Sequence, residues 1–258
     1  RLKERPDTLD HDAGFLYHLA FTADYKVTGS DEARTIALEA ADLLAKRYHP
    51  RGKFVNAWNV WKPGDAFSEN NRGRIIIDCM YNLPLLFWAA EASGNAEWRH
   101  IAADHADVSA KTLVRPDYTT YHTYLFDPVT GVPVRGETHQ GHADDSCWSR
   151  GQAWAIGGYA HAYRYTKNPA YLELAKKLAD VYLELAAGDE VPPWDFALTG
   201  KQDEPLDASA AVIAAAGLLE IAEHVQGEER LRYRQEAIRI ADGVYRRCGT
   251  RDMPGQEG

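Results

Sequence analysis

The chain has 258 residues, 45% of them hydrophobic and 11% aromatic, which is enough to bury a large core. Its formal net charge of −9 argues against nucleic acid or an anionic membrane as a partner, and no apolar run is long and uncharged enough to cross a bilayer. Three widely spaced cysteines favour a reducing, cytoplasmic compartment over a disulfide scaffold. We therefore expect one domain over residues 1–258. Because the chain begins at Arg1 rather than at methionine, we also expect it to be a piece of a longer protein.

Pairs of helices recur along the chain. In each pair the first helix is largely apolar and rich in small residues, whereas the second is amphipathic. The four pairs are predicted at 12–28 with 30–48, 83–93 with 96–113, 148–166 with 170–185, and 207–225 with 228–247. This repeat predicts an all-α toroid of helical hairpins with the apolar helices inside, and an open α-solenoid is the alternative.

One segment departs from the helical pattern. Residues 118–136 alternate between apolar and polar side chains on both sides of the turn at Asp127–Gly131. This pattern is typical of a β-hairpin, which is the one non-helical element that we predict from the sequence.

Asp78 is the most unusual charge in the sequence, because it stands in the otherwise apolar segment IIIDCMYNLPLLFW. A buried carboxylate either finds a cation, for which Arg72 and Arg74 are candidates, or shifts its pKa. Counting back 16 or 17 residues from the break in each hairpin leads to Asp12, Asp78, Arg150 and Ser209 in turn. We expect these positions to meet where the inner helices begin, although Pro84 also allows the second inner helix to start after Asp78.

The two aspartates of this register form a candidate acid pair. Two carboxyl groups in one cleft raise each other's pKa, so that one of them can hold a proton near neutral pH and act as a general acid. The alternative for Asp12 and for Asp78 is that each side chain caps a helix N-terminus.

The segment HQGHADDSCWSRGQAW, residues 139–154, is the densest in polar and aromatic groups. Its histidines and aspartates match no common metal spacing, so we expect no metal site. Arg150 and Trp154 share a helix face, where arginine suits a substrate carboxylate and tryptophan suits a sugar ring. A structural arginine beside a core tryptophan explains the spacing equally well.

These motifs resemble one known family. HDAGF, NRGRIIIDCMYNLPLLFWAAE, TYHTYLFDPVTG, THQGHADDSCWSRGQAW and LDASAAVIAAAGLLE, in this order, are similar to the unsaturated glucuronyl hydrolases, glycoside hydrolase family 88. The resemblance implies an (α/α)6 barrel, of which the four hairpins would be an incomplete set, with one small β-hairpin insertion.

The resemblance also implies an activity: removal of a 4,5-unsaturated uronic acid from the non-reducing end of lyase-generated oligosaccharides, by hydration of the C4=C5 vinyl ether. Asp78 would then be the general acid and base, and Asp12 the second carboxylate. The implied substrate contacts are His11, Phe15, Trp61, His122, Gln140, Trp148, Arg150 and Trp154, and no cofactor is implied.

Three other functions compete with this interpretation. The nearest is an unsaturated rhamnogalacturonyl hydrolase acting on pectin fragments, which shares the barrel and both carboxylates. An epimerase would conserve substrate mass, and a non-catalytic oligosaccharide-binding toroid would bind without cleavage. The oligosaccharide substrate is the only partner that we expect from the sequence.

Overall fold

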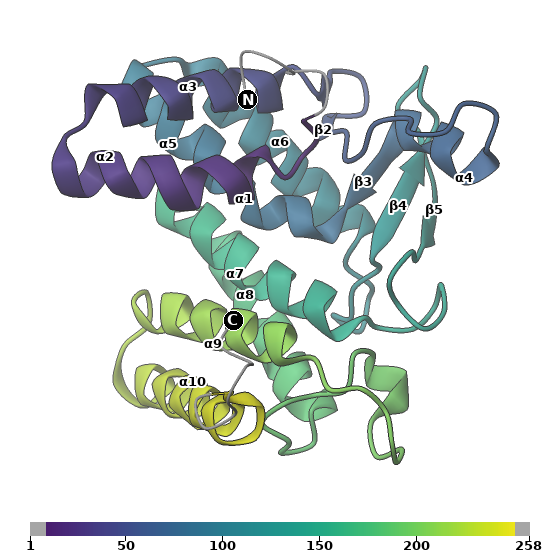
Figure 1. Cartoon of the computed structure of the whole chain (residues 1–258), viewed down its shortest axis with the longest axis vertical. Coiled ribbons are helices and arrows are strands. Elements are labelled where there is room, and N and C mark those ends of the chain that lie inside the picture. Colours follow the sequence, from purple (N-terminus) through teal and green to yellow (C-terminus); the bar gives the residue numbers. More distant parts are fainter. Residues whose placement is uncertain (1–8, 251–258) are drawn as a thin grey trace.

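The computed structural model describes residues 9–250. The first two helical hairpins lie together at one end of the long axis of the molecule, the third lies in the middle and the fourth at the other end (Figure 1). The first inner helix is a continuous rod of α1 (Ala13–Tyr17), the π-helical η2 (His18–Thr22) and α2 (Ala23–Thr28), paired with α3 (Asp31–Ala45). The other pairs are α5 (Leu83–Ser93) with α6 (Ala96–Thr112), α7 (Ser149–Thr166) with α8 (Pro169–Leu185), and α9 (Ala208–Ala222) with α10 (Gly227–Cys248). All four predicted hairpins are confirmed, and each boundary lies within three residues of the prediction.

The turns inside the hairpins follow from local chemistry. Three inner helices end at a residue in the left-handed conformation, namely Gly29, Gly94 and Lys167. The next outer helix then begins with a side-chain cap, in which Ser30, Asn95 and Asn168 accept a hydrogen bond from a backbone N–H of the first turn. Such caps stop one helix and start the next within two residues, which fixes the hairpin geometry.

Small residues let the inner helices approach closely. A Cβ atom on Gly158 of α7 would lie 2.5 Å from the Cβ of Met80, and one on Gly217 of α9 would lie 2.9 Å from the backbone N of Gly157. The glycines therefore allow α7 to pack against both α9 and the segment that carries Asp78. One hydrophobic core includes buried residues from all four hairpins.

The predicted β-hairpin is present as β4 (Thr123–Phe126) and β5 (Pro133–Glu137), which pair antiparallel. The structure also contains strands that the sequence analysis did not predict. Within residues 9–250, β3 (Arg74–Ile76) joins β4 to form a three-stranded sheet, and β1 (Tyr48–His49) pairs with β2 (Phe54–Val55). Three residues of β3 in a longer apolar run give too short an alternation to distinguish a strand from a helix. The sheet lies on the side where the inner helices begin (Figure 1).

Asp78 lies in a 3-10 turn between β3 and α5. The turn, η4, spans Ile77–Tyr81, and α5 begins at Leu83 with Pro84 in its first turn. The proline therefore marks the helix start, as its fixed φ and missing N–H predict. Shorter elements complete the description: α4 (Ala66–Glu69), η3 (Asn70–Gly73) and η5 (Phe196–Leu198). None of the helices between residues 9 and 250 has the length and apolar character that crossing a membrane requires.

Candidate active site

A cavity of about 550 Å³ opens beside the end of β3 and the starts of η4 and α1. Five residues predicted from the sequence line it: His11, Asp12, Trp61, Asp78 and Gln140. The sequence-based site did not include the other lining residues, which are Asp10, Trp58, Asn59, Ile76 and His139. The cavity therefore brings both predicted aspartates together with aromatic and amide side chains.

Asp78 has no cation as a partner in the described chain. Arg72 pairs with Glu69 at 2.9 Å, and Arg74 pairs with Glu137 at 2.9 Å. The Oδ1 atom of Asp78 is shielded from solvent and has no hydrogen-bond partner among residues 9–250. Neither candidate ion pair therefore forms. Without a positively charged partner, the Asp78 carboxylate is costly to bury, and its neutral, protonated form is favoured.

The environment of Asp78 favours its protonated form. The pKa of Asp78 is raised to about 7. Burial is the largest cause and the negative charge of Asp12 adds to the rise, while its backbone N–H and the charge of Arg150 oppose it. Desolvation disfavours a carboxylate, as does a like charge nearby. A carboxyl group with this pKa can donate a proton near neutral pH and take one back afterwards.

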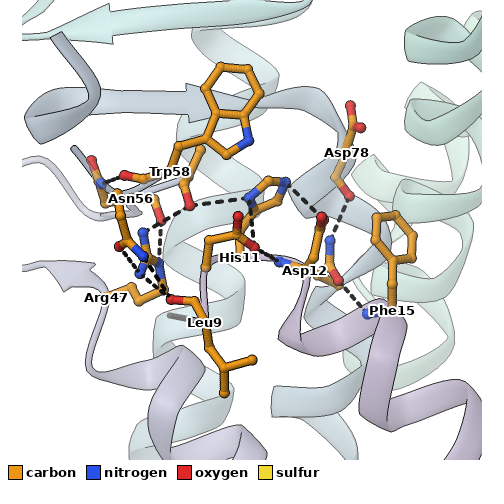
Figure 2. A network of polar contacts seen from close by, with 12 residues as sticks. Leu9, His11, Asp12, Phe15, Arg47, Asn56, Trp58 and Asp78 are labelled. Carbon is orange, nitrogen blue, oxygen red and sulfur yellow. Dashed lines mark hydrogen bonds and ion pairs between the residues drawn. The ribbon is translucent and has the colours of Figure 1, made fainter. Parts of the chain in front are cut away.

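Asp12 occupies the N-cap position of α1, yet its side chain makes no capping hydrogen bond. Its carboxylate lies 3.2 Å from Nε2 of His11 instead, and burial raises the pKa of Asp12. The ring of His11 is held from its other side by a 3.1 Å contact between Nδ1 and the carbonyl oxygen of Ala57 (Figure 2). Asp12 therefore faces the cavity and leaves the helix terminus uncapped.

The Asp10, His11 and Asp12 side chains are the one group within residues 9–250 whose ligand atoms cluster closely enough to hold a metal ion, all within 4.8 Å. Two of these side chains already have partners. Oδ1 of Asp10 accepts the backbone N–H of Asp12 at 3.0 Å, and Nδ1 of His11 contacts Ala57. The group fits a hydrogen-bonded cluster that orients Asp12, and the chemistry proposed below does not require a metal.

Two further predicted residues lie behind the loop that lines the cavity. His122 is buried, and its Nδ1 accepts the backbone N–H groups of His139 at 2.9 Å and of Gln140 at 3.1 Å. The ring of Trp148 packs against His122 at 4.6 Å. Burial lowers the pKa of His122 to about 3, so the ring stays neutral while it holds the loop.

Phe15 and Trp154 form a second aromatic group outside the cavity lining. Their ring centroids lie 4.7 Å apart, and both pack against Tyr81 of η4. The backbone N–H of Phe15 donates to Oδ1 of Asn82, which ties α1 to the start of α5. These contacts place both predicted side chains beside the segment that carries Asp78.

Arg150 already holds a carboxylate. Its Nη2 donates to Oδ2 of Asp207 at 2.9 Å, and its Nε donates to the same oxygen at 3.1 Å. Asp207 also caps α9 by accepting the N–H of Ala210 at 2.8 Å. The ion pair joins residues 57 positions apart, and no pattern in the sequence predicted it.

Residues 3–247 match the family model of Glycosyl Hydrolase Family 88, so the chain belongs to that family. The unsaturated glucuronyl hydrolase of Bacillus sp. (strain GL1) is 44% identical over 232 residues, which cover 90% of this chain and 60% of that protein. The unsaturated chondroitin disaccharide hydrolase of Streptococcus pneumoniae is 39% identical over 225 residues, covering 87% and 55% of the two chains. The chain thus spans little more than half the length of these relatives.

The crystal structure of the Bacillus sp. GL1 unsaturated glucuronyl hydrolase superposes with a TM-score of 0.87 at 42% identity. The superposition covers 94% of this chain and 64% of that one. Its alpha/alpha barrel confirms the predicted fold class.

Proposed function

We propose that the chain is the catalytic domain of a hydrolase that removes a 4,5-unsaturated uronic acid from the non-reducing end of lyase-generated oligosaccharides of the glycosaminoglycan type. One observation carries this proposal. Asp78 is a carboxyl group without a cation partner in residues 9–250, its pKa is raised to about 7, and it lies in an aromatic-lined cavity beside Asp12. The names of the relatives, one acting on chondroitin disaccharides, support the substrate class.

In this reaction the protonated Asp78 transfers its proton to C4 of the vinyl ether. The positive charge that develops is shared between C5 and the ring oxygen, and the nearby Asp12 carboxylate stabilises it. A water molecule attacks C5 while the Asp78 carboxylate accepts a proton from that water, which restores the acid. The resulting hemiketal opens between C5 and the ring oxygen, and the hemiacetal left at C1 then releases the rest of the sugar chain.

The substrate contacts that we propose are those implied by the family resemblance. Of these, His11, Trp61 and Gln140 line the cavity, and the others lie behind or beside it, namely Phe15, His122, Trp148, Arg150 and Trp154. Within the cavity, Trp61 is half-exposed and suits an apolar sugar face, and the amide of Gln140 suits a hydroxyl or carboxylate. Arg150, whose guanidinium already binds Asp207, would offer its remaining donors. All three cysteines are free, which supports the cytoplasmic location that we propose.

The test follows the conjugated alkene directly. The full-length protein is mixed with unsaturated disaccharides from glycosaminoglycan and from pectin lyases, and the ultraviolet absorbance of the C4=C5 bond is recorded. We expect the absorbance to decay with the glycosaminoglycan substrates. Decay with the pectin fragments alone would indicate the rhamnogalacturonyl activity, and no decay with any uronyl sugar would reject the proposal.

A further inference from the structure

Arg74 is the largest side chain that is completely buried in the described chain, and it lies behind one wall of the cavity. Its Nε donates to Oδ1 of Asn71 at 3.0 Å, and its Nη1 donates to Oγ1 of Thr123 at 3.0 Å and to Oε2 of Glu137 at 2.9 Å. Nη2 has no acceptor within residues 9–250. A buried guanidinium with an unused donor costs stability, which points to a role for Arg74 beyond stabilising the fold.

The face of the guanidinium carries aromatic rings. Its central carbon lies 4.2 Å from the ring centroid of Phe67 and 6.0 Å from that of Trp58. A cation over an aromatic face is attracted by the ring quadrupole, and the attraction is stronger where water is excluded. Arg74 therefore anchors Phe67 of α4, in a segment that is otherwise mostly exposed, to the edge of the sheet.

Phe67 in turn touches the rings that line the cavity. Its centroid lies 4.9 Å from that of His139 and 5.9 Å from that of Trp61. Trp58 packs against His139 at 5.5 Å and against Trp61 at 5.7 Å. Trp58, Trp61 and His139 all line the cavity, whereas Arg74 and Phe67 do not. We call these three lining rings the aromatic wall.

We propose that Arg74 is a positioning residue for substrate binding: its guanidinium holds Phe67 and Trp58, and through them the whole aromatic wall, in the arrangement that receives the sugar. The substrate role rests on the proposed function, whereas the positioning of the wall does not. Because Arg74 is buried and reaches neither the cavity nor Asp78, its loss should weaken binding and leave the proton transfer unchanged.

Two neighbouring substitutions separate positioning from simple structural support. Phe67→Leu removes the ring over the guanidinium and keeps every hydrogen bond of Arg74. Glu137→Gln weakens the ion pair of Arg74 and keeps the stacked rings. A residue needed only for stability would make both variants unstable and leave KM unchanged in both.

We expect Phe67→Leu to raise KM for an unsaturated disaccharide about 10-fold, with kcat within about 2-fold and the pH profile unmoved, since a dry cation–π contact is of this order. Arg74→Lys should behave similarly, because lysine keeps the charge but lacks the planar fork. Glu137→Gln should lower Tm and change KM less than about 2-fold. An unchanged KM in Phe67→Leu, or an equal rise of KM in Glu137→Gln, would overturn the proposal.

A measurement on the ligand-free protein keeps this test independent of the activity. In full-length protein labelled with 5-fluorotryptophan, Arg74→Lys should shift the fluorine resonances of Trp58 and Trp61 and leave those of Trp88 and Trp98 in place. If these shifts occur while the wild type cleaves no uronyl sugar, the proposed function fails and the positioning of the wall stands. If all four resonances stay in place, the positioning by Arg74 is refuted even in an active enzyme.

Discussion

Asp78 and Asp207 are carboxyl groups near the starts of inner helices, and they differ in whether a positively charged side chain binds them. Asp207 is 5% exposed, caps α9 and binds Arg150, so its charge is matched on two sides. Asp78 precedes α5, caps nothing and has no ion-pair partner in the part of the chain that the structure describes. A carboxyl group near the start of an inner helix is therefore a structural anion in one hairpin and a candidate acid in another.

Asp78 has no positively charged partner among the described residues because the nearby arginines bind other carboxylates. Arg72 and Arg74 stand within six residues of Asp78, yet Glu69 and Glu137 bind them on the far side. The charge of Arg150 lowers the pKa of Asp78 by less than burial raises it, and the Arg150 guanidinium is bound to Asp207. Because all three arginines are paired with other carboxylates, burial is the main influence on the pKa of Asp78.

The largest expected effect is that of Asp78→Asn. Loss of the proton donor should lower kcat at least about 1000-fold, within the range for general acid–base catalysis. Steady-state kinetics on an unsaturated disaccharide measures this effect, and circular dichroism checks the fold. If the variant kept more than a tenth of the activity, Asp78 would not be the acid.

Asp207→Asn should act on stability instead. Breaking the pair with Arg150 leaves a half-buried guanidinium without its carboxylate, which should cost about 2 kcal/mol after allowance for the exposure of Arg150. Urea unfolding measures the loss, and the protein should remain an active enzyme. If the variant were as stable as the wild type, the ion pair between Arg150 and Asp207 would not stabilise the fold, and Asp207 would not be a structural anion.

Asp12→Asn should shift the pH profile. The pKa of Asp78 is raised to about 7, so the protonated acid is lost above that pH and kcat/KM should fall about tenfold per pH unit there. Because the charge of Asp12 contributes to that rise, removing it should lower the pKa of Asp78 and move the basic limb to lower pH by up to about one unit. A basic limb that stayed in place would mean that burial alone sets the pKa.

The smallest expected effect is on how the stability of the folded protein depends on pH. A carboxyl whose pKa is higher in the folded state than in the unfolded state stabilises the fold at low pH and loses that contribution as pH rises through the folded value, about 7. Asp78→Asn cannot ionise, so it should be more stable than the wild type at pH 8 by on the order of 1 kcal/mol, with less difference at pH 5. Thermal unfolding at both pH values checks the sign.

The helical hairpins were predictable because their signals are local. The 3.6-residue period, the break residues such as Gly29 and Gly94, and the capping Asn95 all act within a few residues of one another. The position of Asp78 was predictable in part, since Pro84 left open the later helix start that the structure has.

The rest depended on contacts between distant segments. The sequence suggested Arg74 as a partner of Asp78, but strand pairing between β3 and β4 brings Arg74 to Thr123 and, beyond it, to Glu137, 63 residues away. Trp58 and His139 join the cavity only because the loop before β3 and the loop after β5 meet there. No periodic pattern carries such information, because each contact is fixed by the packing of the whole domain.

The most direct test of Asp78 as the acid is to measure its protonation. In full-length protein labelled with ¹³C at the aspartate carboxyl carbon, the resonance that disappears in Asp78→Asn is followed across a pH titration. The structure predicts a midpoint of about 7 for this resonance. A midpoint near 4, the ordinary value for an aspartate, would contradict the assignment of Asp78 as the acid of this site.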